Sequence, residues 1–308
     1  MSNIAAMRGA GFGGRVMRWR RSVWLASIGA VFGMGLTAGP AVAETGRLYD
    51  PGDFVAGHPG MDYLQLVQIA LPSVVLSPDT HMMQGQLPTP TPRHIAGHDY
   101  EGDPPDPVTL GTIEDKRILV GGKPRIALLV DLGPDPDRVQ GTELLILLTD
   151  EPTPKVLDMA DVAIDKDTVF ADQAVLKVGP GDDALVTWSE HDDADLTLGG
   201  YVLISTVGDH LALIGTIRLQ SERLCAWSNI EGVKFSTSPD PSGPYARVVA
   251  AIHADFKRSK DSCGENGIPK AHAQTFRATW GWEPTSGTYQ STSDGLKQLG
   301  AFNDIVFK

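Results

Sequence analysis

The stretch "YVLISTVGDHLALIGTIRL", residues 201–219, decides the fold class. Two apolar runs flank the pair Gly208-Asp209, and a Gly-Asp pair between such runs is typical of a hairpin turn. In the second run polar and apolar residues alternate, which is the period of a strand. The alternation predicts that four residues share one face of that strand: Leu211, Leu213, Ile217 and Leu219. We therefore expect 201–207 and 210–219 to form an antiparallel hairpin.

The same texture continues on both sides of this hairpin. "RIALLVD", 125–131, and "ELLILLT", 143–149, are short apolar runs bounded by turn residues, a pattern that fits strands buried on both faces. "YARVVAAIHADF", 245–256, and "HAQTFRATWGW", 272–282, alternate again and predict a second antiparallel pair. The sequence therefore predicts a mainly β fold, either an antiparallel meander or a β-sandwich.

Two short helices are expected, one before and one after the predicted strands. "MDYLQLVQIALP", 61–72, has no clean apolar stripe, so we expect a short and mostly buried helix that ends at Pro72. "TSDGLKQLGAF", 292–302, predicts a short C-terminal helix with Ser293 as its N-cap. In this helix Leu296 and Leu299 should face inward.

The N-terminus predicts export. Residues 1–43 carry five arginines and no acidic residue, and the apolar run "SVWLASIGAVFGMGLTAG" ends shortly before "AVA" and Glu44. A basic start, an apolar middle and a small-x-small end indicate a secretory signal peptide cleaved before Glu44. The alternative is an uncleaved membrane anchor. We expect a periplasmic or secreted protein with no stable membrane span after cleavage.

Composition divides the remaining chain into two regions. Six prolines in "LPTPTPR", 87–93, and "EGDPPDPV", 101–108, exclude regular helix and interior strand from those segments. We expect a loop-rich, Pro-rich N-terminal region over 44–120 and an antiparallel β domain over 121–308.

The charge balance excludes one class of partner. The whole chain has 26 basic and 38 acidic residues, and removal of 1–43 leaves 21 basic residues and a net charge near −17. Nucleic acid needs a basic surface, so we expect no nucleic-acid partner. An anionic membrane surface is disfavoured for the same reason. A protein or carbohydrate partner is compatible with this charge.

The two cysteines predict a disulfide. Cys225 and Cys263 both follow the predicted cleavage site, and an oxidising compartment favours a bond between them. Two buried free thiols are the alternative, because spacing alone does not fix pairing. Two cysteines are too few for a haem or iron–sulfur motif, and we expect no cofactor.

An acidic stretch raises the question of a metal site. "KVLDMADVAIDKDTVFAD", 155–172, contains five aspartates: Asp158, Asp161, Asp165, Asp167 and Asp172. It lacks the turn glycine and the late glutamate of a calcium loop. A hard cation held by Asp165, Asp167 and a remote carboxylate such as Asp182 or Asp183 is the less favoured alternative. We favour a strand or loop edge whose carboxylates face water, with no metal.

Two histidine-containing stretches carry residue types that occur in metal or catalytic sites. In "RHIAGHDYEGD", 93–103, His94 and His98 have the spacing of a zinc pair on a helix, but Gly97 and the flanking prolines disfavour a helix. In "WSEHDDAD", 188–195, an acid–base set lacks a nucleophile, because a neighbouring serine on a strand points to the opposite face. That set is Glu190, His191 and Asp192. We interpret the first stretch as surface residues and the second as a polar hairpin connection.

A row of aromatic residues suggests either a core or a binding surface. Phe276, Trp280 and Trp282 share parity on one predicted strand, and Tyr289 follows. An exposed row would suit a carbohydrate or a protein partner, but large aromatic side chains more often fill a core, which we favour. We assign no catalytic residue. The predicted function is an exported, non-enzymatic β-rich protein with a binding or envelope-structural role, and the alternative is an exported hydrolase that uses carboxylates or a metal.

Overall fold

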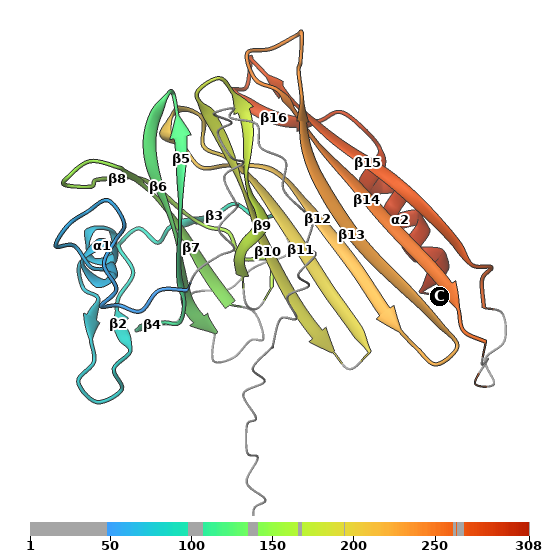
Figure 1. Ribbon diagram of the computed structural model, residues 1–308, viewed down its shortest axis with the longest axis horizontal. Coiled ribbons are helices and arrows are strands. Elements are labelled where there is room, and N and C mark those ends of the chain that lie inside the picture. The colour runs from blue at the N-terminus through green and yellow to red at the C-terminus, as the bar shows by residue number, and fades with distance from the viewer. Residues whose placement is uncertain are drawn as a thin grey trace, which may run out of the picture. The chain divides into compact units, whose positions relative to one another are not determined.

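The computed structural model describes residues 48–97, 107–134, 141–165, 168–193, 195–260, 263 and 268–307. Ala43–Lys308 form one compact unit. As predicted, the fold is mainly β, with antiparallel sheets and one short helix near each end of the described chain (Figure 1). Neither of these two helices is long and apolar enough to cross a membrane.

A five-stranded sheet has the order β3-β8-β7-β6-β5. Its strands are β3 (Arg93–His94), β5 (Ile113–Val120), β6 (Lys123–Pro134), β7 (Gly141–Thr149) and β8 (Val156–Asp161). Every side chain of 126–130 and 144–148 is buried, which confirms the prediction that both strands are buried on both faces. Because β5 ends at Val120 and pairs with β6, this sheet contains strands from both sides of residue 120.

One face of the five-stranded sheet packs against the N-terminal elements. These are the helix α1 (Tyr63–Ala70) and a three-stranded sheet of β1 (Val75–Leu76), β2 (Met83–Gly85) and β4 (Val108–Leu110). Asp62 and Gln65 start α1 with a capping box, in which the Gln65 backbone N–H donates to the Asp62 carboxylate at 2.8 Å. The predicted short, buried helix is therefore present.

The second large sheet is an antiparallel meander of eight strands in sequence order. They are β9 (Thr168–Gly179), β10 (Asp182–Asp193), β11 (Leu196–Ser205), β12 (Ala212–Arg223), β13 (Trp227–Ser238), β14 (Arg247–Arg258), β15 (His272–Glu283) and β16 (Thr288–Ser291). The predicted pairs β11–β12 and β14–β15 are both present. One face of β9–β12 packs on the five-stranded sheet through a shared apolar cluster.

This meander turns back on itself between β12 and β13. The two strands share only two residue pairs, next to their connection, and then separate. The halves β9–β12 and β13–β16 then pack against each other: the Ala246 N–H donates to the Val178 carbonyl at 2.7 Å, and the Tyr201 and Phe235 ring centroids are 5.2 Å apart. The fold is therefore sandwich-like.

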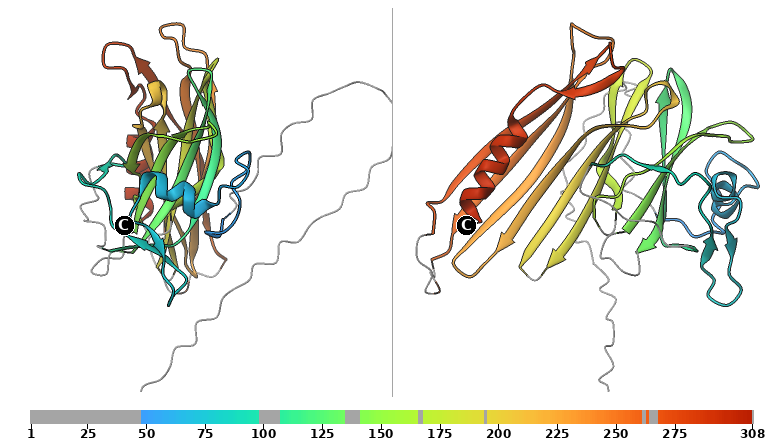
Figure 2. Two further views of the ribbon diagram at one scale, coloured as in Figure 1. Left: turned by 90° about the vertical axis from the view of Figure 1, so that its left-hand side faces the viewer. Right: turned by 180° about the vertical axis from the view of Figure 1, so that it is seen from behind.

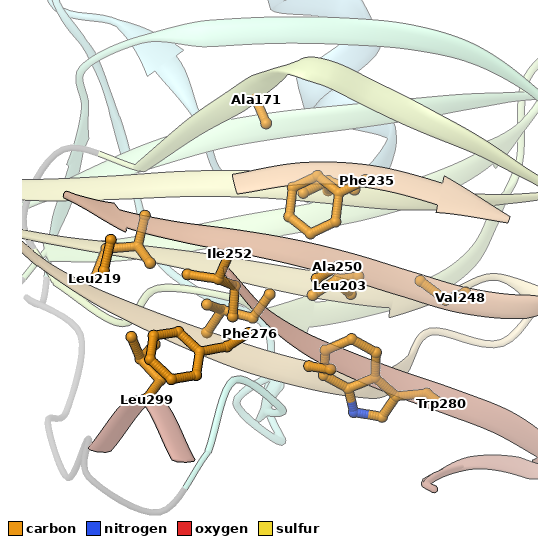
Figure 3. Close-up of a cluster of buried hydrophobic side chains, with 14 of the residues drawn as sticks. Ala171, Leu203, Leu219, Phe235, Val248, Ala250, Ile252, Phe276, Trp280 and Leu299 are labelled. Atoms are coloured by element: carbon orange, nitrogen blue, oxygen red, sulfur yellow. The ribbon is translucent and has the colours of Figure 1, made fainter. Parts of the chain in front are cut away.

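The core between these halves contains three of the four predicted aromatic residues, and the fourth, Trp282, is partly buried and packs against it. Phe276, Trp280 and Tyr289 are at most 3% exposed, which confirms that they belong to the core. The C-terminal helix α2 (Gly295–Val306) lies along β14 and β15 (Figure 2), and its Leu299 points toward Phe276 (Figure 3). The burial of Leu299 confirms its predicted inward orientation.

Two details of the sequence prediction were wrong. Ser293 does not cap α2, because its hydroxyl accepts from Thr279 N–H and donates to a carbonyl of β15; Asp294 occupies the N-cap position. The four residues predicted to share one face of 210–219, which are Leu211, Leu213, Ile217 and Leu219, do not share it. A register shift in the β11–β12 pair makes Ile214 an extra residue. The two leucines before it therefore face the five-stranded sheet, and the two apolar residues after it face the other core.

The hairpin turn and the disulfide are both present in the structure. The turn includes a 3-10 segment, Val207–Asp209, rather than two residues alone, and Gly208 and Asp209 adopt φ values of 71° and 61°. Cys225 and Cys263 form the predicted disulfide pair, with their Cα atoms 6.1 Å apart. The pair ties the β12–β13 turn to the β14–β15 connection.

Carboxylate side chains accept backbone hydrogen bonds where the two large sheets meet. The backbone N–H groups of Phe170 and Thr168, on β9, donate to Glu114 and Glu143 of the five-stranded sheet. In the opposite direction, Leu119 N–H donates to the Asp183 carboxylate at 2.8 Å. Side-chain acceptors thus take the place of a further strand along the facing edges of β5 and β9.

Candidate functional site

The main candidate site is a hollow of about 460 Å³ between α2, β12 and the residues around β3. We call it the α2 hollow. Its lining residues come from four separate parts of the chain: His94, Ala96, Gly97, Ile164, Thr216, Arg218, Gln220, Leu296, Leu299, Gly300, Asn303 and Asp304.

One wall of the α2 hollow carries an oriented histidine. His94 Nδ1 lies 2.8 Å from the Asp161 carboxylate, which is 7% exposed. The other Asp161 oxygen accepts from the backbone N–H groups of Glu143 and Ala163, at 3.2 and 3.1 Å. Because Asp161 is fixed from the protein interior, it in turn fixes the position of the His94 ring.

The floor of the hollow is the outer face of β12. Thr216, Arg218 and Gln220 line it, while Ile217 and Leu219, which alternate with them, point into the core. The Thr216 hydroxyl donates to the Ala96 carbonyl at 2.7 Å, which joins the segment after β3 to β12. The extended period of β12 therefore presents three polar side chains to the hollow.

The wall formed by α2 rests on a buried polar cluster. Glu231 accepts from the Gln220 backbone N–H at 2.8 Å and from the Asn229 amide at 3.3 Å. Asn303 of α2 also bonds to Glu231, and burial raises the pKa of the Glu231 carboxyl despite these hydrogen bonds. This cluster occupies the place where β12 and β13 separate, so it satisfies backbone groups that a strand pair would otherwise satisfy.

The α2 hollow is lined by both apolar and polar side chains. Ile164, Leu296 and Leu299 provide apolar surface, Arg218 provides a positive charge and Asp304 a negative one, and the remaining polar side chains can form hydrogen bonds. Binding sites for small molecules commonly have volumes of about 300–1,000 Å³ and combine apolar walls with a few polar groups. This arrangement can hold a small amphiphilic molecule.

The structure corrects the interpretation of two aspartates in 155–172. Asp158 receives two hydrogen bonds from Arg93, at 2.8 and 2.7 Å, and one from Leu211 N–H at 2.7 Å. Burial alone would raise the pKa of Asp158, but these bonds outweigh it and the pKa is lowered. Asp161 is buried against His94. Neither aspartate is on a water-facing edge, because β3 and the β11–β12 turn cover β8.

The other acidic residues of that stretch are placed differently. Asp172 is exposed, as predicted, and Asp165 lies 3.4 Å from His191. Asp167 lies outside the described residues. The Asp182 and Asp183 carboxylates accept from backbone N–H groups of Gly121 and Leu119 at the sheet junction. In the part of the chain that the structure describes, no group of three His, Cys, Asp or Glu side chains could hold a metal ion.

The remaining histidine-containing candidates do not converge. His98, the proposed partner of His94, lies outside the described residues. Glu190, His191 and Asp192 lie on β10 itself, not in the connection after it, and they bond to three different partners: Trp188, Asp165 and Thr197. Ser189 is fully buried and its hydroxyl lies 2.6 Å from that of Thr168.

Several lining residues of the α2 hollow were missed by sequence reasoning. Arg218, Gln220, Asn303 and Asp304 carry no local motif, because they become neighbours only when α2 docks beside β12. The alternation of 216–220 was a usable signal for polar side chains on one face, but it does not indicate what covers that face.

Comparison with known proteins gave no match: no protein-family model, no curated protein and no solved structure is significantly similar to this chain.

Proposed function

We propose that this chain is an exported, non-enzymatic binding protein that holds a small amphiphilic molecule with an anionic head group in the α2 hollow. The observation that carries the proposal is the mixed lining of this hollow. An apolar chain would pack against Leu296 and Leu299, and its head group would meet the guanidinium of Arg218.

The placement of polar groups supports binding over hydrolysis. Thr216 is the hydroxyl-bearing residue of the hollow, and its proton goes to the Ala96 carbonyl rather than to His94. A nucleophile that is to be activated must donate to its base. Ser189, the serine next to the acid–base set of β10, is fully buried. These groups therefore fit a binding role better than nucleophilic catalysis.

Calorimetric titration with octanoate tests the proposal. We expect one octanoate to bind per chain. Gly300 lines the hollow and a Cβ added there would meet no atom within 4 Å, so Gly300→Trp should fill the hollow without disturbing α2 and should abolish binding. Ala301→Trp is the matched control, because Ala301 is an exposed neighbour on the same helix that does not line the hollow.

Absence of octanoate binding to the parent protein would contradict the proposal. Equal binding by parent, Gly300→Trp and Ala301→Trp would place the ligand elsewhere and contradict it as well.

A further inference from the structure

A second hollow, of about 350 Å³, lies where β9 meets β13. We call it the aromatic hollow. It shares no lining residue with the α2 hollow, and its lining includes Asp172, Gln173, Trp188, Tyr201, Lys234 and Phe235. Neither its residues nor its chemistry enter the function proposed above.

An irregularity in β9 forms the rim of the aromatic hollow. Phe170 pairs with Thr187 and Val175 with Leu185, so the four residues 171–174 stand opposite Val186 alone. A bulge of this kind bends a strand and redirects its side chains, and bulges are frequent beside functional sites. Ala171 lies on this bulge, on a strand that faces Phe235 (Figure 3), while Asp172 is exposed.

Four aromatic side chains line the aromatic hollow, and three of them, from three different strands, form a series of ring contacts. The ring centroids of Trp188 and Tyr201 are 4.4 Å apart and tilted by 45°, and those of Tyr201 and Phe235 are 5.2 Å apart at 72°. Gly199 leaves the space in which the Trp188 indole lies, since a Cβ at that position would overlap the ring. The inclined rings therefore form walls rather than one flat platform.

Carboxylates accompany these rings. Glu190 accepts from the Trp188 Nε1–H at 3.3 Å, so its charge is held beside the indole edge. Asp172, on the bulge, is exposed and lines the hollow. Burial, together with Asp172 and Glu190, raises the pKa of the Tyr201 phenol, which agrees with a negative potential in the hollow.

We propose that the aromatic hollow binds an organic cation of the quaternary-ammonium class, with the rings of Trp188, Tyr201 and Phe235 as its walls and the carboxylates of Asp172 and Glu190 as its counter-charges. Aromatic faces attract such cations through their quadrupoles, and the attraction increases where water is excluded. Phe170, which also lines the hollow, already makes a contact of this kind, since Lys116 Nζ lies 5.7 Å from its ring centroid.

The main competing ligand is a neutral sugar. A sugar ring stacks on one exposed flat aromatic face, whereas the three rings here are inclined to each other. Among the lining residues the charges of Asp172 and Lys234 offset each other, and Glu190, bonded to the Trp188 indole, adds one further negative charge beside the hollow. A cation gains from that charge, whereas a neutral ligand does not. The inclined rings and the excess of negative charge both favour a cation.

Two probes of the same shape and different charge test the proposal. Choline carries the quaternary ammonium, and 3,3-dimethylbutan-1-ol replaces its nitrogen with carbon. We expect choline to shift the Trp188 indole N–H signal in a two-dimensional NMR spectrum in a saturable manner, with the neutral isostere at least about fivefold weaker. Loss of one signal in Trp188→Phe assigns the resonance.

Variants that change the charge at the aromatic hollow provide a second test of choline binding. Asp172→Asn and Glu190→Gln should each weaken choline binding by about fivefold, since each removes a counter-charge. Lys234→Gln should strengthen binding, because Lys234 is an exposed cation that lines the same hollow. Asp304→Asn is the control, as this carboxylate lines the α2 hollow instead, and it should leave choline binding unchanged.

Three outcomes would overturn the proposal. They are equal affinity for choline and its neutral isostere, no shift at Trp188 with choline at tens of millimolar, and a response at Trp188 to glucose or N-acetylglucosamine but not to choline. The α2 hollow is tested separately with octanoate, so failure of either proposal leaves the other standing.

Discussion

Reduction of the Cys225–Cys263 disulfide should destabilise this protein by an amount that the chain geometry sets. The two cysteines are 38 residues apart in sequence. In the chain-entropy model, a closed loop of that length lowers the entropy of the unfolded chain enough to stabilise the fold by about 4 kcal/mol at 25 °C. Both ends of the bridge lie in connections between strands, so opening it leaves the strand pairs themselves intact.

This free energy converts into a measurable shift in melting temperature. A folded unit the size of Ala43–Lys308 unfolds with an entropy of about 0.56 kcal/mol/K at the midpoint, from about 2.1 cal/mol/K per residue. The loss of about 4 kcal/mol should therefore lower Tm by about 7 °C. A hydrogen bond of 2.7 Å from Ser259 N–H to the Ala226 carbonyl joins the same two connections and should persist in the reduced protein.

Differential scanning calorimetry with and without a phosphine reductant measures this shift. The double variant Cys225→Ser/Cys263→Ser should melt like the reduced parent protein and should not respond to the reductant. A parent protein whose Tm is unchanged by reduction would refute the argument. So would titration of two free thiols in the native, unreduced protein.

Three further perturbations have expected outcomes. Burial, followed by the charges of neighbouring carboxylates, raises the pKa of Glu143 in the folded state, so the parent protein should lose stability as the pH rises above the unfolded value of about 4.3. Glu143→Gln should therefore raise the urea midpoint more at pH 8 than at pH 5, and an equal change at both would contradict this reasoning. Asp209→Ala should cost about 2 kcal/mol in urea unfolding, because Arg125, which is 6% exposed, loses two hydrogen bonds of 2.6 and 2.9 Å; an unchanged midpoint would count against it. Gly199→Ala should lower stability by about 1–3 kcal/mol, as its methyl group overlaps the Trp188 ring, and a Tm equal to that of the parent protein would show that the indole can move aside.

Most of the correct fold prediction came from the regular alternation of polar and apolar residues along the strands. The strands of 245–256 and 272–282 pair as expected, because their period of two survives unbroken along their length. The prediction for 210–219 was wrong at one point. Ile214 is an extra residue relative to β11, so the side chains before it and after it do not share one face. No feature of the local sequence distinguishes Ile214 from its apolar neighbours, since the insertion depends on the partner strand.

The candidate sites were much less predictable than the strands. Asp158 and Asp161 resembled solvent-facing carboxylates because their partners, Arg93 and His94, are more than 60 residues away in sequence. The same limit applies to the aromatic hollow, where Trp188 and Phe235 come together only because the meander turns back between β12 and β13. Sequence periodicity predicts which residues share a strand face, and it does not predict which two faces meet.

The carboxylates at the junction of the large sheets also affect how the protein associates with itself. An unpaired strand edge is a template on which another chain can add a strand and begin a fibril. Along the facing edges of β5 and β9, Glu114, Glu143 and Asp183 already occupy backbone N–H groups that an incoming strand would need. A protonated carboxyl still accepts a hydrogen bond, so this protection should persist in acid. Fibril growth by strand addition would then have to start at an edge such as β1, where both residues are exposed but the strand is only two residues long.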